Sequence, residues 1–515
     1  PSYFFCIIWG YIIVKIASEI NAPAELQPTP MLARPLAVPR NDARSRIGWM
    51  IRQKINRIEL QLRQVPLLDV AHMNSPVLIF TFERADYLER TLTKVFDNHP
   101  AQKLAAKSRE NIDGSGSDLR SSKQDSTGKA NRIAGAPIVI SQDGKNAEVQ
   151  KVVEMFRQLF EMKLGVPLYS IEHPRSDVGI DPLSRESWSQ PYKLLAAHYG
   201  WALNQVFSGT AYTNRRKNTR PIPTPPLPQR VIILEEDIEI SNDFFSLMNA
   251  TADLLDSDET LLAVSAFNDN GKKHFVSDAK RIVRSDFFPG LGWMMARSVW
   301  DDPPSHPGAG LKRDWAPGGY WDDWLRESAQ RHGRQIIRPE VSRTFHIGNI
   351  NGASAGEYNN MLSDIELEEN DIQWEDQDLS HLDASSFADN YWNRVSRAKL
   401  VSTVKEAKNY VAHKDVRLVY SHFDEFRELA HSLNIMADEK AGVPRTAYEG
   451  IVEIRYGRGN FFVFLTPPYV AESVKPGHFG KKAWKEYTKE SMMQVLGIKV
   501  VPVELHVEPE FGDGW

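Results

Sequence analysis

Three consecutive acidic residues stand directly after a short apolar run. Glu235, Glu236 and Asp237 follow the segment RVIIL (230–234), whose composition is typical of a strand buried in a parallel sheet. Packed carboxylates repel one another, and a bound cation relieves that repulsion. Mg²⁺ and Mn²⁺ prefer carboxylate oxygens and leave positions open for substrate phosphates. The triplet therefore indicates a divalent metal site for a nucleotide diphosphate, with a solvated acidic turn as the alternative.

A second acidic cluster combines two carboxylates with two indole rings. Asp322 and Asp323 are flanked by Trp321 and Trp324. Aromatic rings provide a face on which a sugar can stack, and a partly desolvated setting raises the pKa of a carboxylate. Such a carboxylate suits a general base that removes a proton from an attacking hydroxyl. An ordinary helix N-terminus, where Asp is favoured by capping, is the alternative.

The elements around these clusters indicate an α/β fold with a mostly parallel sheet. Continuous apolar runs predict strands at 76–81, 136–141, 167–171 and 230–234, and helical patterns predict helices at 85–98, 146–163 and 190–207. Strands that alternate with helices form parallel sheets, which bind ligands at the carboxyl ends of their strands. Arg84, Asp143 and the acidic triplet all follow strand ends, so we expect them to converge on one crevice.

Composition restricts the class of protein. The chain has 515 residues, enough for two or three domains, and a net charge of -5. Nucleic acid is therefore not an expected partner, because its phosphates require a basic face. Cys6 is the only cysteine in the sequence, which excludes disulfides and cysteine metal sites from the globular part.

The domain prediction starts from the apolar segment at residues 4–14. It fits a signal peptide or a truncated membrane anchor, because a full span needs about 20 apolar residues. We therefore predict an anchor at 1–17 and a stem at 18–75, with an amphipathic helix near 46–63. A catalytic domain follows at 76–400, with polar insertions at 101–135 and 209–229. A smaller β-rich domain at 401–515 contains the runs VRLVYS, GIVEIRY and NFFVFLT.

An ordered series of motifs resembles the N-acetylglucosaminyltransferase I family. The resemblance runs from about residue 77 to about 467. It rests on SQD (141–143), HYGWAL (198–203), the acidic triplet, VSAFNDNGK (264–272), SDFFPGLGW (285–293), WDDW (321–324), RPEVSRT (338–344) and AGVPRTAYEGIV (441–452). Ordered motifs of this length are highly specific.

The resemblance implies a fold, a reaction and a location. The fold is GT-A, and the enzyme is a type II Golgi membrane protein with a lumenal catalytic domain. It uses UDP-N-acetylglucosamine (UDP-GlcNAc) and Mn²⁺, inverts the anomeric centre, and forms a β-1,2 bond to mannose of a high-mannose N-glycan, which starts hybrid and complex glycan synthesis.

The resemblance also implies a role for each site residue. Asp322 is the catalytic base and Asp237 the metal ligand. The other residues bind the donor. Arg84 contacts the diphosphate or the sugar, Asp143 and His198 contact uracil, and Glu236 contacts ribose. The transferred sugar is contacted by Glu235, Leu291 and Trp321, and the nucleotide by Ser354.

This chain departs from the family pattern at several positions. The family typically has Asp where Glu236 stands, and the spacing before His198 and before Ser354 is one residue longer. Two disulfides common in animal members are absent as whole pairs, with Phe82 and Gly144 at one pair and Ala263 and Ile336 at the other. Two alternative functions remain: transfer of N-acetylglucosamine to O-linked mannose, and glycan binding without catalysis.

Overall fold

The computed structural model describes residues 75–103, 135–175, 190–213, 226–315, 319–348 and 362–467. All of them lie in the compact unit that begins at Pro66. The predicted anchor, all but the last residue of the predicted stem, and most of both polar insertions lie outside the described residues. No helix within the described ranges is long and apolar enough to cross a membrane.

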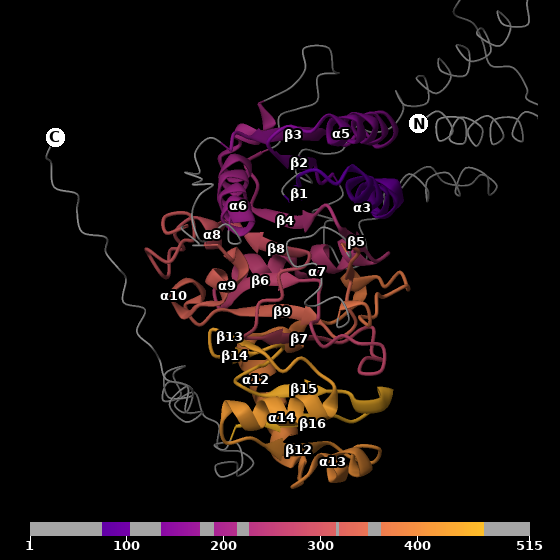
Figure 1. Ribbon diagram of the computed structural model, residues 1–515, viewed down its shortest axis with the longest axis vertical. Helices are drawn as coiled ribbons and strands as arrows, with labels where there is room; N and C mark the ends of the chain where they lie inside the picture. The colour runs from indigo at the N-terminus through magenta and orange to yellow at the C-terminus, as the bar shows by residue number, and fades with distance from the viewer. Residues whose placement is uncertain are drawn as a thin grey trace, which may run out of the picture. The chain divides into compact units, whose positions relative to one another are not determined.

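The described residues form an eight-stranded sheet with the strand order β3-β2-β1-β4-β8-β6-β9-β7 (Figure 1). Strands β7 and β8 run antiparallel to their neighbours, and the other adjacent pairs are parallel. The predicted α/β class with a mostly parallel sheet is therefore confirmed. The strand bounds are β1 Val77–Thr81, β2 Ile138–Asp143, β3 Leu168–His173, β4 Arg230–Glu235, β6 Leu261–Ser265, β7 Ile282–Ser285, β8 Trp293–Ala296 and β9 Gln335–Pro339.

The register of the central strands brings the predicted site residues to one edge. Strand β1 lies between β2 and β4, and every residue of β1 is buried. Phe80 is opposite Glu235 in β4, and Thr81 is opposite Gln142 in β2. The carboxyl ends of all three strands therefore meet, as expected for a ligand site in an α/β sheet.

Helices pack on this sheet through apolar stripes. In α3, Leu88, Leu92 and Val95 are buried at helical spacing. Asn146 caps α5 by accepting hydrogen bonds from the next residues' N–H groups. The helix bounds here are α3 Ala85–Asn98, α5 Ala147–Leu159 continued by a π-helical segment Phe160–Leu164, α6 Gln190–Ser208, α7 Phe244–Ser257, α8 Arg297–Trp300, α9 Trp321–Arg326 and α10 Ser328–Arg331.

A short two-stranded sheet follows the acidic triplet. Strand β5 (Ile238–Ile240) pairs antiparallel with β10 (Thr344–His346), and His346 is opposite Ile238. This pairing brings a segment more than a hundred residues away in sequence next to Asp237.

The C-terminal described segment has its own sheet and its own apolar core. Its four strands are β11 Lys399–Leu400, β12 Val416–Val419, β15 Val452–Ile454 and β16 Val463–Thr466, so the three predicted β runs are present. It also contains helices α12 Ala384–Arg397, α13 Val404–Tyr410 and α14 Phe423–Leu433, and the hairpin β13 Glu439–Lys440 with β14 Val443–Pro444. Phe275 and Phe287 from the larger part complete its core. In Figure 1 these elements lie beyond β7.

Candidate active site

The acidic triplet forms the turn between β4 and β5. Glu235 is the last residue of β4, and Ile238 begins β5. Arg84 stands at the start of α3, just after β1, and its fork reaches two of the acids. Its Nε is 2.7 Å from Glu236 Oε1 and its Nη2 is 2.7 Å from Asp237 Oδ2. Burial lowers the pKa of Arg84, but the charges of the two carboxylates more than offset it.

Glu236 is held by the end of β1. Its Oε2 accepts hydrogen bonds from the Thr81 hydroxyl at 2.5 Å and from the Phe82 N–H at 2.9 Å. Burial raises the pKa of Glu236, and these bonds together with Arg84 counteract only part of that effect. The side chain is fixed before any ligand arrives.

Asp237 has one engaged oxygen and one free oxygen. Oδ2 contacts Arg84 and also lies 3.4 Å from His346 Nε2. Burial raises the pKa of Asp237. The hydrogen bond and charge of His346 and the charge of Arg84 lower it by a larger amount, so the pKa lies below its ordinary value. Oδ1 is buried and has no hydrogen-bond partner among the described residues. An ionised carboxylate with one unused buried oxygen is suited to a cation.

The pKa of Glu235, unlike that of Asp237, lies above its ordinary value. Burial and the charge of Asp237 raise its pKa to about 7, although Tyr199 donates a hydrogen bond to Oε1 at 2.6 Å. At neutral pH this carboxyl is therefore partly protonated and can donate as well as accept a hydrogen bond.

Tyr199 connects the triplet to the second acidic cluster. Its ring lies between Phe80, with centroids 3.8 Å apart, and Trp321, with centroids 4.1 Å apart. Burial raises the pKa of Tyr199, as do the charges of Glu235, Asp322 and Asp237. Tyr199 is therefore hydrogen-bonded to the triplet through Glu235 and stacked on Trp321, the residue before Asp322.

Asp322 lies in the first turn of α9. One oxygen, Oδ2, is 2.7 Å from Arg326 Nη1, and about a third of the side chain is exposed. Arg326 is buried and also donates to the Phe288 carbonyl, which fixes its position. The other oxygen of Asp322 forms no hydrogen bond within the described ranges and is available to a substrate.

Asp323 points to the C-terminal part of the chain. It pairs with Arg326 at 2.6 Å and with Lys440 of β13 at 3.0 Å. Burial raises the pKa of Asp323, but these two cations lower it below its ordinary value. The two aspartates of the cluster therefore have different environments, and Asp322 has the less occupied carboxylate.

The glycine-rich loop between β7 and β8 lies between the two clusters. The Leu291 carbonyl accepts a hydrogen bond from the Thr344 hydroxyl at 2.7 Å. A β-carbon on Gly292 would lie 2.5 Å from the Thr344 methyl, and the φ of Gly292 is +78°. Only glycine allows the loop to approach β10 this closely, so the backbone of Leu291 is fixed against Thr344.

Asp143, one of the two predicted uracil contacts, is the last residue of β2 and lies next to the end of β3. Asp143 Oδ1 is 2.8 Å from His173 Nδ1, and Oδ2 is 3.0 Å from Arg175 Nη2. Burial raises the pKa of Asp143, but hydrogen bonds from His173 and Arg175 lower it below its ordinary value. Arg175 also lies over the Phe82 ring and against Gly144, which places it between the residues of one missing disulfide.

His198 is buried in α6, next to Ser141 and His173. Its Nε2 is 2.7 Å from the Ser141 hydroxyl, and its ring stacks on His173. Burial lowers the pKa of His198 to about 3, so the ring is neutral at physiological pH. Ser354 lies outside the described residues.

Sequence reasoning missed several residues that define this site. Tyr199, Arg175, His173 and Arg326 carry no motif signal of their own, although Tyr199 is inside HYGWAL. His346 carries no motif signal either, because a lone histidine is more often structural than a ligand. Its position next to Asp237 depends on the β5–β10 pairing, which the sequence pattern does not predict.

Comparisons with known proteins agree with the resemblance. Residues 132–478 match the GNT-I family. A protein of Arabidopsis thaliana named alpha-1,3-mannosyl-glycoprotein 2-beta-N-acetylglucosaminyltransferase is 34% identical over 385 residues, which cover 74% of this chain and 71% of that protein. A crystal structure of an active-site mutant of LgtC matches 48% of this chain and 65% of that chain, with 10% identity and a TM-score of 0.21, too weak a likeness to indicate shared function. Because the family match includes both acidic clusters and most of the chain, the protein belongs to the GNT-I family.

Proposed function

We propose that the protein transfers N-acetylglucosamine from UDP-GlcNAc, in β-1,2 linkage, to the α-1,3-arm mannose of a high-mannose N-glycan. The observation that supports the proposal is the position of Tyr199, which donates a hydrogen bond to Glu235 of the triplet and stacks on Trp321 next to Asp322, in a member of this family. One carboxylate is suited to a cation and the other to a proton. A similar protein is named for this reaction.

The donor diphosphate is proposed to bind beside the ion pair of Arg84 and Asp237. No group of three or more His, Cys, Asp or Glu side chains suited to a metal is present in the described part of the chain. The free Oδ1 of Asp237 fits a cation that takes one oxygen from the protein and others from the diphosphate. Mn²⁺ bound there would neutralise charge on the departing UDP. Arg84 adds a second positive charge on the same side.

The remaining donor contacts are proposed at one edge of the sheet. Glu235, with its raised pKa, can donate a hydrogen bond to the sugar, and the fixed Glu236 can accept one from ribose. The pocket wall at the transferred sugar is Leu291 and Trp321. We assign uracil binding to Asp143 and His198, and a further nucleotide contact to Ser354.

Transfer is proposed to occur by a single inverting displacement. The mannose 2-hydroxyl oxygen forms a bond to the anomeric carbon while the bond from that carbon to the diphosphate oxygen breaks. Asp322 accepts the hydroxyl proton, and UDP leaves with the electron pair. Arg326 holds Oδ2 of Asp322, so the other oxygen is the proposed proton acceptor. Trp321 and Tyr199 provide a rigid aromatic wall that orients the reacting sugar.

The proposed location is the Golgi membrane, with the catalytic part lumenal and attached through the apolar segment at 4–14. This proposal is supported by the sequence resemblance and by the apolar composition of that segment. Immunofluorescence of the full chain and protease protection of Golgi vesicles test it.

The direct test is incubation with UDP-GlcNAc, Mn²⁺ and a five-mannose N-glycan, followed by linkage analysis of the product. We expect one β-1,2-linked N-acetylglucosamine on the α-1,3 arm, loss of transfer with EDTA, and recovery with Mn²⁺. A parallel reaction with an O-mannosyl peptide should give little product. Preferred transfer to that peptide would move the acceptor assignment to O-mannose, and no transfer to either acceptor would overturn the proposed activity.

A further inference from the structure

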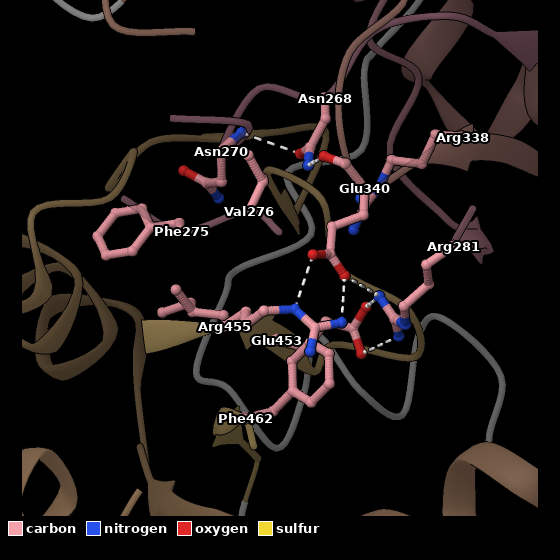
Figure 2. Close-up of a pocket in the computed structure, with 11 residues that line it drawn as sticks. Asn268, Asn270, Phe275, Val276, Arg281, Arg338, Glu340, Glu453, Arg455 and Phe462 are labelled. Carbon is pink, nitrogen blue, oxygen red and sulfur yellow. Dashed lines mark hydrogen bonds and ion pairs between the residues drawn. The ribbon is translucent and has the colours of Figure 1, made fainter. Parts of the chain in front are cut away.

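A small cavity lies where the large sheet meets the C-terminal sheet. Its volume is about 20 Å³, and it shares no lining residue with the candidate active site. The charged groups that line it are Arg281, Arg338, Glu340, Glu453 and Arg455, which come from both sheets and the segments beside them (Figure 2). Arg338 and Glu340 belong to the motif RPEVSRT, for which the proposed reaction has no role.

Four of these five charges neutralise one another in pairs. Arg281 binds Glu453 through two contacts, of 2.7 and 2.9 Å. Arg455 binds Glu340 through two contacts, of 2.7 and 2.8 Å. Bidentate arginine–carboxylate pairs of this kind satisfy both charges. Asp278, 3.8 Å from Arg455, is about half exposed and lies on the solvent side.

Arg338 has no such partner. Only 4% of it is exposed, and it forms no ion pair with a described carboxylate. Two of its nitrogens donate to the carbonyls of Pro339 and Thr446, and Nε is buried without any acceptor in the described part of the chain. A guanidinium cannot lose its proton at physiological pH, so this charge stays in the interior, favoured by the charge of Glu453 but without a carboxylate in contact among the described residues.

A second buried donor, outside the cavity lining, is also unsatisfied. The Tyr391 hydroxyl is buried and has no partner among the residues described. Burial and the charge of Glu453 raise the pKa of Tyr391, and the charges of Arg281 and Arg338 lower it by less. Asp269 also affects Arg338, more weakly, but is paired with its own arginine, Arg445. Arg338 Nε and the Tyr391 hydroxyl are therefore two buried donors without an acceptor within the described ranges.

We propose that this cavity binds one small monovalent anion, for which chloride is the probe, with Arg338 Nε as a donor. The cavity is large enough for a single water-sized species and too small for phosphate, sulfate or a carboxylic acid. The net positive charge of the lining groups, three arginines against two glutamates, favours an anion over a cation. The bound ion stabilises the contact between the two sheets. The inference does not depend on the proposed transfer activity.

The first test locates the ion in the wild-type protein. Crystals of the full chain are grown with bromide in place of chloride, and anomalous scattering is measured at the bromine edge. We expect an anomalous peak inside the cavity within hydrogen-bond distance of Arg338 Nε. A cavity that shows water density without an anomalous peak overturns the proposal.

The second test measures stabilisation. Thermal unfolding is followed at constant ionic strength while chloride replaces gluconate, an anion too large for the cavity. The midpoint should rise by roughly 1–2 °C for each tenfold increase in chloride above the dissociation constant. Arg338→Met, which keeps an apolar stem, should lose this dependence, and Arg427→Met, at an exposed arginine of α14, should keep it. Equal chloride dependence in all three proteins overturns the proposal, and if Arg338→Met does not fold, the bromide measurement still decides.

Discussion

The backbone of Gly348 lies directly against the carboxylate of Asp237. A β-carbon built on Gly348 would overlap Asp237 Oδ2 and would lie 2.9 Å from His346 Nε2. The preceding N–H, of Ile347, donates to the Asp237 carbonyl at 2.9 Å, so this segment is tied to the triplet. Position 348 therefore admits no side chain while Asp237 keeps its orientation.

Gly348→Ala should weaken binding of Mn²⁺ and of UDP in the presence of Mn²⁺ by about tenfold or more, because the added methyl displaces the carboxylate that is proposed to hold the cation. Calorimetric titration with UDP and Mn²⁺ measures the effect. The matched control is Gly459→Ala, where the nearest atom to an added β-carbon is 3.6 Å away. Unchanged affinity in Gly348→Ala would contradict the placement of the metal at Asp237.

Asp322→Asn should lower the transfer rate by about 10²–10⁴-fold, because the amide cannot accept the mannose proton. The affinity for UDP should stay within about twofold, since Asp322 is placed on the acceptor side. Steady-state kinetics and UDP titration separate the two effects. Asp323→Asn is the control, because its carboxylate is already held by Arg326 and Lys440 and should tolerate the change with a loss of about tenfold or less. Near wild-type transfer in Asp322→Asn would mean that another group is the base.

Arg84→Lys should raise the donor KM about tenfold, because one ammonium cannot bind Glu236 and Asp237 through a planar fork. The acceptor KM should not change. Arg90→Lys, six residues further along the chain in α3, removes a more exposed contact with Glu239 and should leave both constants unchanged. Equal effects of the two substitutions on the donor KM would argue against a specific role for Arg84.

The sequence pattern predicts the elements of the site better than their contacts. Helix α3 has the predicted bounds, 85–98, because its apolar stripe and the strand before it are both continuous. The helix predicted at 146–163 is α5 followed by a π-helical segment to Leu164, a change of hydrogen bonding that apolar periodicity does not reveal. The antiparallel insertion of β8 between β4 and β6 depends on long-range pairing, which no local pattern indicates.

Two neighbouring residues show why the contacts within the site are harder to predict. His198 and Tyr199 are consecutive in α6, so their side chains leave the helix in different directions. His198 bonds Ser141 in β2, and Tyr199 bonds Glu235 in β4. The motif HYGWAL identifies the segment, but only the packing of α6 decides which residue reaches the triplet. The individual roles of the predicted site residues stay predictions.

His99, outside the active site, gives the fold a dependence on acid. The ring is fully buried at the end of α3, and burial lowers its pKa to about 4. Its Nε2 is 3.0 Å from the Ala136 carbonyl, and its Nδ1 accepts from the Ala101 N–H at 3.2 Å. The neutral ring therefore has one donor and one acceptor role, and protonation would place a hydrogen on Nδ1 against that N–H.

Since the unfolded pKa is near 6.5, the unfolded chain binds more protons at His99 than the folded chain between pH 6.5 and 4. The free energy of unfolding is unaffected by the protonation of His99 above about pH 6.5. It decreases as the pH is lowered below that value, and the loss reaches about 3 kcal/mol at pH 4. His99→Gln keeps a donor for Ala136 and should flatten this part of the profile, measured by urea unfolding at pH 7, 6, 5 and 4.5. The control His413→Gln, at an exposed histidine, should leave the slope of stability against pH unchanged. A wild-type slope in His99→Gln would show that other groups cause the acid sensitivity, with the buried His198, whose pKa is about 3, as the next candidate.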